Sequence, residues 1–432
     1  MNHSNHIFSV SVSYQKKTGH FYYSDINLND IDYLLTKECH VVCNKTQYKQ
    51  LIGSLKPSIK CIWIVDSEFK EETLLKDGIV QCNTTILKNR LHYKYPDDLF
   101  IFTSAHSWFF NMTTTIHLNI NKEGNKERFE FDTCDWKIVE STERRFIYKR
   151  YIQTGELQYL ETLKAISQSN LQPRPDRTGV GTKGFFGGQL KFDIQDSIPL
   201  FTTKYVPYKT VIKELLWFLK GDINVKTLQD QNVHIWDDNT SRTYLDSIGK
   251  TNYPENNLMY GYGHQIRRFG SGEFDQLQYI ENLLQVDPYS RRIFWSLWNA
   301  DQLDLMVLPP CHVSVQFYVD TDKMLSCHLY QRSVDLFLGF PFNIFSYSVL
   351  TYLLAKRHNL KPKELIISTG DTHLYMNHLE QVETQLARNA RPFPRLKVNS
   401  RVIGLSINDV SVEDFELEGY FPHPSIKAKM AV

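Results

Sequence analysis

Residues 308–319 read LPPCHVSVQFYV, and they place Cys311 directly before a segment in which apolar and polar side chains alternate. That alternation predicts a half-buried strand. The turn residues Asp320-Thr321-Asp322-Lys323 follow, and residues 325–330 alternate again, so the whole stretch predicts a β-hairpin. Such a hairpin returns Gln331-Arg332-Ser333 to the side of Cys311, with the register open by a residue or two.

An arginine next to this cysteine would matter chemically, because the thiolate is the nucleophile and a nearby cation lowers the thiol pKa from about 8.5. Each pKa unit is worth about 1.4 kcal/mol in favour of the thiolate. A free cysteine is nevertheless more often a small buried hydrophobe. The hairpin alone therefore leaves Cys311 open as either a nucleophile or a core residue.

Further motifs surround the hairpin in a fixed order. They are residues 176–182 (DRTGVGT), 214–219 (ELLWFL), 235–237 (IWD), 290–292 (SRR), 329–335 (LYQRSVD), 338–344 (LGFPFNI) and 370–375 (GDTHLY). Together with the hairpin they make roughly residues 152 to 432 resemble the thymidylate synthase family. The resemblance implies an α/β (α+β) fold with a twisted mixed sheet at the interface of a homodimer.

The same resemblance implies the reductive methylation of dUMP to dTMP, with 5,10-methylenetetrahydrofolate as the cosubstrate and dihydrofolate as the second product. Cys311 would attack C6 of the uracil. Glu214 would relay protons through water, and Tyr262 would assist removal of the C5 proton. Arg332 and Asp335 complete the implied catalytic set, which requires no metal.

The implied nucleotide contacts come from several of the motifs. A phosphate suits arginine, because its planar fork offers charged, paired donors. By resemblance the dUMP-binding residues are Arg177, Gln331, Arg332, Ser333, Asp335, Asn343, His373 and Tyr375, together with Arg291 and Arg292 from the other subunit. Asn343 favours uracil, since a neutral amide both donates and accepts. In relatives that hydroxymethylate dCMP an aspartate tends to stand there.

The folate contacts implied by resemblance are Lys204, Trp236, Asn239, Asp335, Gly339 and the carboxylate of Val432. Two positions depart from the family pattern. Pro207 stands where a histidine usually follows Lys204 by three residues, which bears on the contacts of the folate tail. Ile266 replaces a common tryptophan, and we interpret it as a packing residue near the site.

One motif has a competing interpretation. Residues 179–184 match the G-x-G-x-x-G pattern of dinucleotide-binding folds. They follow residues 174–178 rather than an apolar strand, and they lead into Phe185-Phe186-Gly187-Gly188 rather than a helix. We therefore predict a flexible anion-binding loop that carries Arg177.

Residues 1–147 predict a separate small α/β domain, with the synthase-like domain covering 148–432. They weakly resemble dihydrofolate reductase, with Asp30 as a retained acid. The glycine and arginine that the family has before Lys-Thr are Cys43 and Asn44 here, and its Gly-Gly is Ser104-Ala105. Side chains there obstruct close backbone approach. We expect a degenerate domain, with NADPH as a cofactor only if it is active.

Composition limits the remaining classes of function. The length of 432 residues favours two domains. A net charge of +1 argues against general nucleic-acid binding. The 7 cysteines are scattered without a C-x-x-C pair, which fits a reducing, cytoplasmic location. No secretory signal or membrane-spanning run is expected.

Three alternatives stay open beside a synthase with a silent first domain. The chain could be bifunctional and also reduce dihydrofolate with NADPH. It could be a dUMP hydroxymethylase, in which water intercepts the intermediate before hydride transfer. It could also be a homologue that binds nucleotide or RNA without turnover.

Overall fold

The computed structural model describes the backbone of residues 6–15, 20–23, 39–43, 47–49, 59–65, 73–76, 79–82, 100–102, 115–120, 128–129, 136–141, 145–150 and 155–431. The chain divides into two compact units. The first contains residues 1–152, 389–392 and 421–424, and the second contains 153–388, 393–420 and 425–432. The boundary predicted at 147/148 falls within a strand of the first unit and stays a prediction.

The described strands of the first unit form one sheet in the order β10-β11-β8-β1-β7-β3-β4-β6-β5, in which β2 also pairs with β1, and β9 pairs with β2. Their bounds are β1 His6–Gln15, β2 His20–Tyr23, β3 Cys39–Cys43, β4 Ile59–Val65, β5 Thr73–Lys76, β6 Ile79–Cys82, β7 Phe100–Phe102, β8 Thr115–Ile120, β9 Arg128–Phe129, β10 Trp136–Ser141 and β11 Arg145–Arg150. The central strands pair in parallel. Parallel strands are usually covered on both faces, and Val42, Ile62 and Ile101 on these strands are accordingly buried.

The second unit is built on a five-stranded mixed sheet, β12-β16-β15-β14-β13. Its strands are β12 Thr182–Asp193, β13 Phe294–Ser296, β14 His312–Val319, β15 Met324–Asp335 and β16 Lys361–Tyr375. Only β15 and β16 pair in parallel, while the other neighbours are antiparallel. The mixed sheet confirms the predicted fold class.

The predicted hairpin is also confirmed, because β14 and β15 pair with His312 opposite Gln331. Asp320 makes its turn: the Oδ1 atom accepts the N–H groups of Asp322 and Met324. Lys323 takes the left-handed conformation at φ 58° that tight turns need. The register shifts between His312 and Ser314, a bulge that alternation alone does not reveal.

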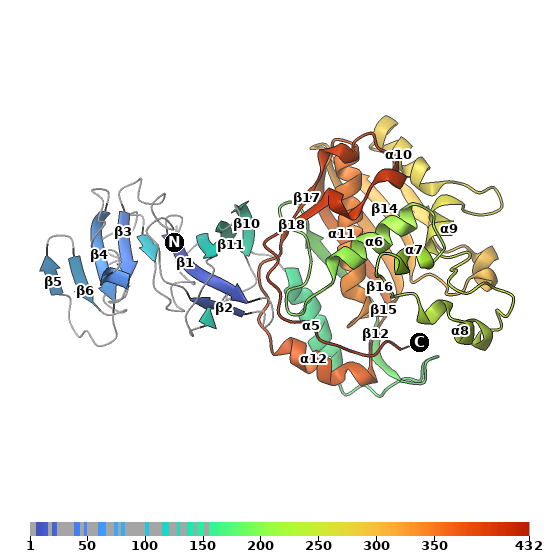
Figure 1. The fold of residues 1–432 in the computed structure, drawn as a ribbon, viewed down its shortest axis with the longest axis horizontal. Coiled ribbons are helices and arrows are strands. Elements are labelled where there is room, and N and C mark those ends of the chain that lie inside the picture. Colours follow the sequence, from blue (N-terminus) through green and yellow to red (C-terminus); the bar gives the residue numbers. More distant parts are fainter. Residues whose placement is uncertain are drawn as a thin grey trace. The chain divides into compact units, whose positions relative to one another are not determined.

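Helices of the second unit pack against this sheet (Figure 1). They are α5 Gly155–Ser167, α6 Tyr208–Leu219, α7 Lys226–Gln229, α8 Arg242–Ser247, α9 Tyr262–Arg267, α10 Gln276–Val286, α11 Gly339–Arg357 and α12 Leu379–Leu386. Short 3-10 turns include η3 Asp238–Thr240 and η5 Met376–His378, and β17 Arg395–Val398 pairs with β18 Phe415–Glu418 in a separate two-stranded antiparallel sheet. No helix among the described residues is long and apolar enough to cross a bilayer.

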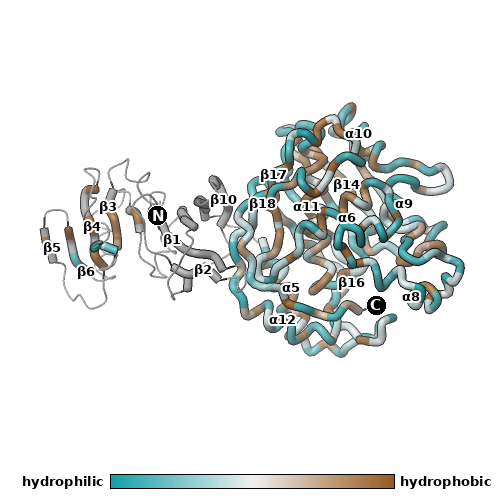
Figure 2. The backbone as a smooth tube through the Cα atoms, viewed as in Figure 1, coloured by the Kyte–Doolittle hydropathy of each residue, from teal (hydrophilic) through white to brown (hydrophobic). Residues whose placement is uncertain are grey.

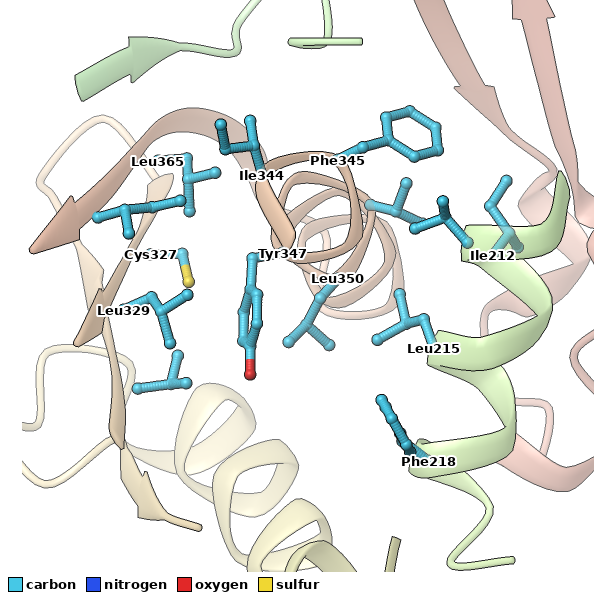
Figure 3. Close-up of a cluster of buried hydrophobic side chains, with 14 of the residues drawn as sticks. Ile212, Leu215, Phe218, Cys327, Leu329, Ile344, Phe345, Tyr347, Leu350 and Leu365 are labelled. Carbon is cyan, nitrogen blue, oxygen red and sulfur yellow. The ribbon is translucent and has the colours of Figure 1, made fainter. Parts of the chain in front are cut away.

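Helix α11 forms the centre of the core, because its side chains are apolar and buried on nearly all sides. It packs against β15, β16 and α6. Figure 3 shows the contact, with Ile344, Phe345, Tyr347 and Leu350 from α11, Ile212, Leu215 and Phe218 from α6, Cys327 and Leu329 from β15, and Leu365 from β16. Hydrophobic stretches accordingly lie inside the second unit, and hydrophilic ones form much of its outer loops (Figure 2).

Candidate active site

The hairpin places an arginine beside the candidate nucleophile. The backbone N–H of Arg332 donates to the Cys311 carbonyl at 2.9 Å. The guanidinium donates from Nε to Pro310 O at 2.9 Å and from Nη2 to Pro309 O at 3.0 Å. Its centre also lies 5.2 Å from the centre of the Trp298 ring. The prediction that the hairpin returns Arg332 to Cys311 is confirmed, and the two prolines serve as its acceptors.

The pKa of the Cys311 thiol lies above its ordinary value, although Arg332 by itself lowers it. Burial raises the pKa of Cys311, which outweighs the charge of Arg332 and a hydrogen bond with Ser333 that lower it. Asp335 adds a further rise. Arg332 therefore lowers the pKa of Cys311, as the sequence analysis expects of a nearby cation, but desolvation penalises the thiolate by more than this one cation favours it.

Tyr262 and the half-buried carboxyl group of Glu214 lie close to the nucleophile. Its hydroxyl accepts the N–H of Cys311 at 2.8 Å. Beside it, Trp236 Nε1 donates to Glu214 Oε1 at 2.8 Å. Burial raises the pKa of Glu214 to about 7, and the hydrogen bond from Trp236 lowers it only in part. A carboxyl with this pKa can both give and take a proton at neutral pH.

A small cavity opens between these groups and the core. Its lining includes Glu214, Tyr262, His312 and Asn343. Its volume of about 20 Å³ is enough for about one water molecule. Ile266 also lines it, which agrees with the packing role predicted for that position.

His312 lies at the site, although no sequence pattern predicted a role for it. Its ring centre lies 5.0 Å from that of Tyr262 and 5.2 Å from that of Tyr347, and it shares a side-chain hydrogen bond with Asn343. Burial lowers the pKa of His312 to about 4, so the imidazole is neutral. A neutral histidine beside the candidate base-recognition amide can fix the orientation of Asn343. The feature of the sequence that could have indicated this role is its position directly after Cys311.

The loop that carries Arg177 is organised by one carboxylate. Asp176 accepts from the N–H of Thr178 at 2.9 Å and from that of Gly181 at 2.7 Å. Gly179 and Gly181 adopt positive φ, at 73° and 81°. The chain then enters strand β12 rather than a helix, which confirms that this motif is no dinucleotide fingerprint. Arg177 itself is exposed, as an anion-binding side chain needs.

The end of β16 carries His373 and Tyr375, whose rings lie 5.3 Å apart. Asp371 orients the histidine: its Oδ1 lies 3.1 Å from His373 Nδ1, and its Oδ2 lies 2.6 Å from Arg174 Nη2. Neither Asp371 nor Arg174 was predicted as a functional residue. Asp371 stood in a quoted motif without a role, because pairing across 197 residues leaves no local pattern.

Asp335 closes the turn between β15 and α11. Its carboxylate accepts the N–H groups of Phe337 and Leu338 at 3.2 Å each and of Gly339 at 3.3 Å. These are unpaired donors at a helix N-terminus, where a negative charge is favourable. Asp335 and Gly339 are thus adjacent, which agrees with the prediction that both contact the folate. Their contact with folate stays a prediction.

Lys204 is 5% exposed, unusual for a lysine. Its ammonium donates to the Phe337 carbonyl and lies 3.5 Å from the centre of the Phe337 ring. Burial lowers the pKa of Lys204 to about 7, while the charges of Asp335 and Glu156 raise it. The ammonium therefore already has a partner inside the protein, and its predicted folate contact stays untested.

The other predicted residues take varied positions. Gln331 is buried, and its Oε1 has no hydrogen-bond partner within the described part of the chain. Asn239 is buried in η3. Arg291 and Arg292 are exposed between α10 and β13. Val432 lies outside the described residues, as do Asp30, Asn44, Ser104 and Ala105 of the first unit.

Comparison with known proteins agrees with this geometry. The thymidylate synthase family matches residues 157–432. Human thymidylate synthase is 47% identical over 289 residues, which cover 64% of this chain and 91% of the human protein. The thymidylate synthase of human herpesvirus 8 type P (isolate GK18) is 46% identical over 288 residues, covering 64% of this chain and 84% of the viral one.

Some relatives carry a second activity in their name. The bifunctional dihydrofolate reductase-thymidylate synthase of Zea mays is 42% identical over 324 residues, covering 72% of this chain and 61% of the maize protein. The family match includes the nucleophile motif, the Arg177 loop and the cavity lining. The chain therefore belongs to the thymidylate synthase family.

Proposed function

We propose that the second unit methylates dUMP through a covalent adduct on Cys311, with methylenetetrahydrofolate as the cosubstrate. The observation that carries this proposal is the position of Tyr262, which accepts the Cys311 N–H and shares a cavity with Glu214. The nucleophile is thereby hydrogen-bonded to a tyrosine that lines the same cavity as a titratable carboxyl. That arrangement suits addition to a ring followed by proton transfer.

The steps follow from these positions. The Cys311 sulfur forms a bond to C6 of the uracil, and the electron pair makes C5 nucleophilic. C5 then bonds to the one-carbon unit of the folate and loses its proton. Release of the folate, hydride transfer from it and expulsion of Cys311 give dTMP and dihydrofolate.

Substrate binding is assigned to three pairs of side chains. Arg177 and Arg332 bind the phosphate, Asn343 with His312 binds the uracil, and His373 with Tyr375 binds the sugar. Trp236, Asn239, Asp335 and Gly339 contact the folate. The exposed Arg177 and the buried free acceptor of Gln331 support the nucleotide assignment.

Mass analysis of the nucleotides formed from dUMP and methylenetetrahydrofolate tests this function. dTMP is the expected product. Hydroxymethyl-dUMP would favour the hydroxymethylase instead, and unchanged dUMP would favour a binding-only homologue.

We further propose a homodimer formed through the uncovered face of the sheet. Phe294, Tyr318 and Tyr330 are 43%, 64% and 40% exposed there, on neighbouring strands. Large aromatic side chains are enriched at interfaces. Arg291 leads into this face, so a partner's Arg291 and Arg292 would complete the phosphate site.

A mixing experiment tests the shared site. Cys311→Ala and the double variant Arg291→Ala/Arg292→Ala should each be strongly impaired, while subunit exchange should restore about one quarter of wild-type activity, because half of the dimers carry one intact site. An active monomer in light scattering, or no recovery on mixing, would contradict the dimer.

For the first unit we propose a reductase-like domain with little or no activity. The bifunctional relatives cover more of this chain than the family match does. Since that match already reaches residue 432, the extra part precedes residue 157. The side chains of Ser104 and Ala105 are the argument against NADPH binding.

Purified protein is accordingly expected to consume no NADPH with dihydrofolate above the rate of an Asp30→Asn variant, measured by absorbance. Consumption that Asp30→Asn abolishes would establish a bifunctional enzyme. If residues 1–147 instead support the synthase dimer, their deletion should reduce solubility or dTMP formation.

A further inference from the structure

The segment 425–431 lies against the second unit in an alternating way. Ile426 and Ala428 pack on the hydrophobic core, while Lys427 and Lys429 are exposed. One directed polar contact is added at its far end, where the Lys429 carbonyl lies 2.8 Å from His378 Nε2. Ile426 and Ala428 are only partly buried, so this hydrogen bond adds appreciably to the attachment of the segment.

His378 is fully buried in η5, at 0% exposure. A carbonyl only accepts, so Nε2 must carry the hydrogen. Nδ1 has no partner within the described ranges. The imidazole therefore makes its one hydrogen bond among the described residues with the segment 425–431. Burial of the other ring nitrogen without a partner costs free energy.

The other neighbours of His378 belong to the proposed ligand sites. Its ring centre lies 5.4 Å from that of Phe337 and 5.7 Å from that of Tyr375. Phe337 is itself fixed, because its N–H donates to Asp335 and its carbonyl accepts from Lys204. A displaced His378 ring would therefore disturb a turn in which both backbone polar groups of Phe337 are otherwise held by hydrogen bonds.

We propose that His378 is a positioning residue that couples the segment 425–431 to the turn 335–339 and to Tyr375. Ordering of the segment and ordering of the two ligand contacts then support each other through one ring. The coupling to ligands rests on the proposed function of Tyr375 and of the turn. The attachment of the segment does not.

Tryptic cleavage of the full-length protein without ligands tests the attachment. The cleavage rate after Lys427 and Lys429 is followed by mass spectrometry in wild type and in His378→Leu, His378→Asn and His378→Gln. Leucine and asparagine should raise the rate about tenfold. Glutamine should stay within about twofold of wild type, because its longer amide places a donor near Nε2.

The glutamine and asparagine variants form the matched pair, since both remain polar and only the reach differs. Equal protection in all variants would overturn the attachment, and so would equal loss in glutamine and asparagine. This readout does not depend on catalysis, so it stands even if no dTMP is formed.

The coupling is tested by a double-mutant cycle with a chain that lacks residues 429–432. In the full-length enzyme, His378→Leu should lower kcat/KM for methylenetetrahydrofolate about tenfold. In the shortened enzyme it should cost only about twofold, because the acceptor carbonyl is gone and only the ring contacts with Phe337 and Tyr375 remain to be changed. A loss of the same size in both backgrounds would show that His378 acts independently of the segment and would overturn the proposal.

Discussion

Replacement of Cys311 by alanine is expected to abolish dTMP formation, with kcat lowered by at least about 10⁴-fold. The Cys311 sulfur forms the bond to C6, and alanine has no group that could form it. Nucleotide binding should persist, because the arginines and Asn343 remain. The measurement is product formation by mass analysis, with dUMP affinity by calorimetry.

Cys327→Ala is the matched control. Cys327 lies in the core on β15, where burial raises the pKa of its thiol to about 12, so it cannot supply a thiolate. That variant should keep its activity and lose only about 1 kcal/mol of stability. Full activity of Cys311→Ala would remove the covalent mechanism.

Glu214→Gln should lower kcat by about 10² to 10⁴-fold while the fold and dUMP binding persist. The amide keeps the size of the side chain and its contact with Trp236, yet it cannot relay a proton. Because burial raises the pKa of Glu214 to about 7, its acid form is lost as pH rises through that value. The wild-type rate should fall as pH rises across this range, and the rate of the glutamine variant should not show this fall.

The same shift has a consequence for stability. The folded state binds the Glu214 proton more tightly than the unfolded state, whose carboxyl has the ordinary pKa of 4.5. Stability should therefore fall as pH rises from 4.5 to about 7, and Glu214→Gln should reduce that slope. Melting temperatures at pH 5 and pH 8 measure it, with the exposed Glu161→Gln as the control. An identical slope in both variants would assign the pH dependence to another group.

The features predicted correctly from the sequence are those that local pattern determines. Alternation and a turn predicted the β14–β15 hairpin, and the hairpin brought Arg332 to Cys311. Residues 179–184 are not preceded by an apolar strand or followed by a helix in the sequence pattern, which correctly excluded a dinucleotide-binding motif there. Each of these depends on neighbours within about one hairpin.

Long-range packing accounts for what the sequence did not predict. The raised pKa of Cys311 and the neutral state of His312 depend on how much water the surrounding helices exclude. The Arg174–Asp371 pair joins distant segments, and the burial of Lys204 reverses the usual place of a lysine. No periodicity in the chain encodes such contacts.

In the mixed sheet, the nucleophile with its arginine and the anion-binding loop come from parts of the chain that are far apart in sequence. Cys311 and Arg332 meet through adjacent strands of one hairpin, whereas the Arg177 loop joins them only when β12 pairs with β16, with Thr182 opposite Tyr375. Closing the longer loop costs about 2 kcal/mol more chain entropy than closing the hairpin. During folding, the nucleophile and its cation can therefore form from local contacts, and the anion-binding loop is added only after the intervening chain has been ordered.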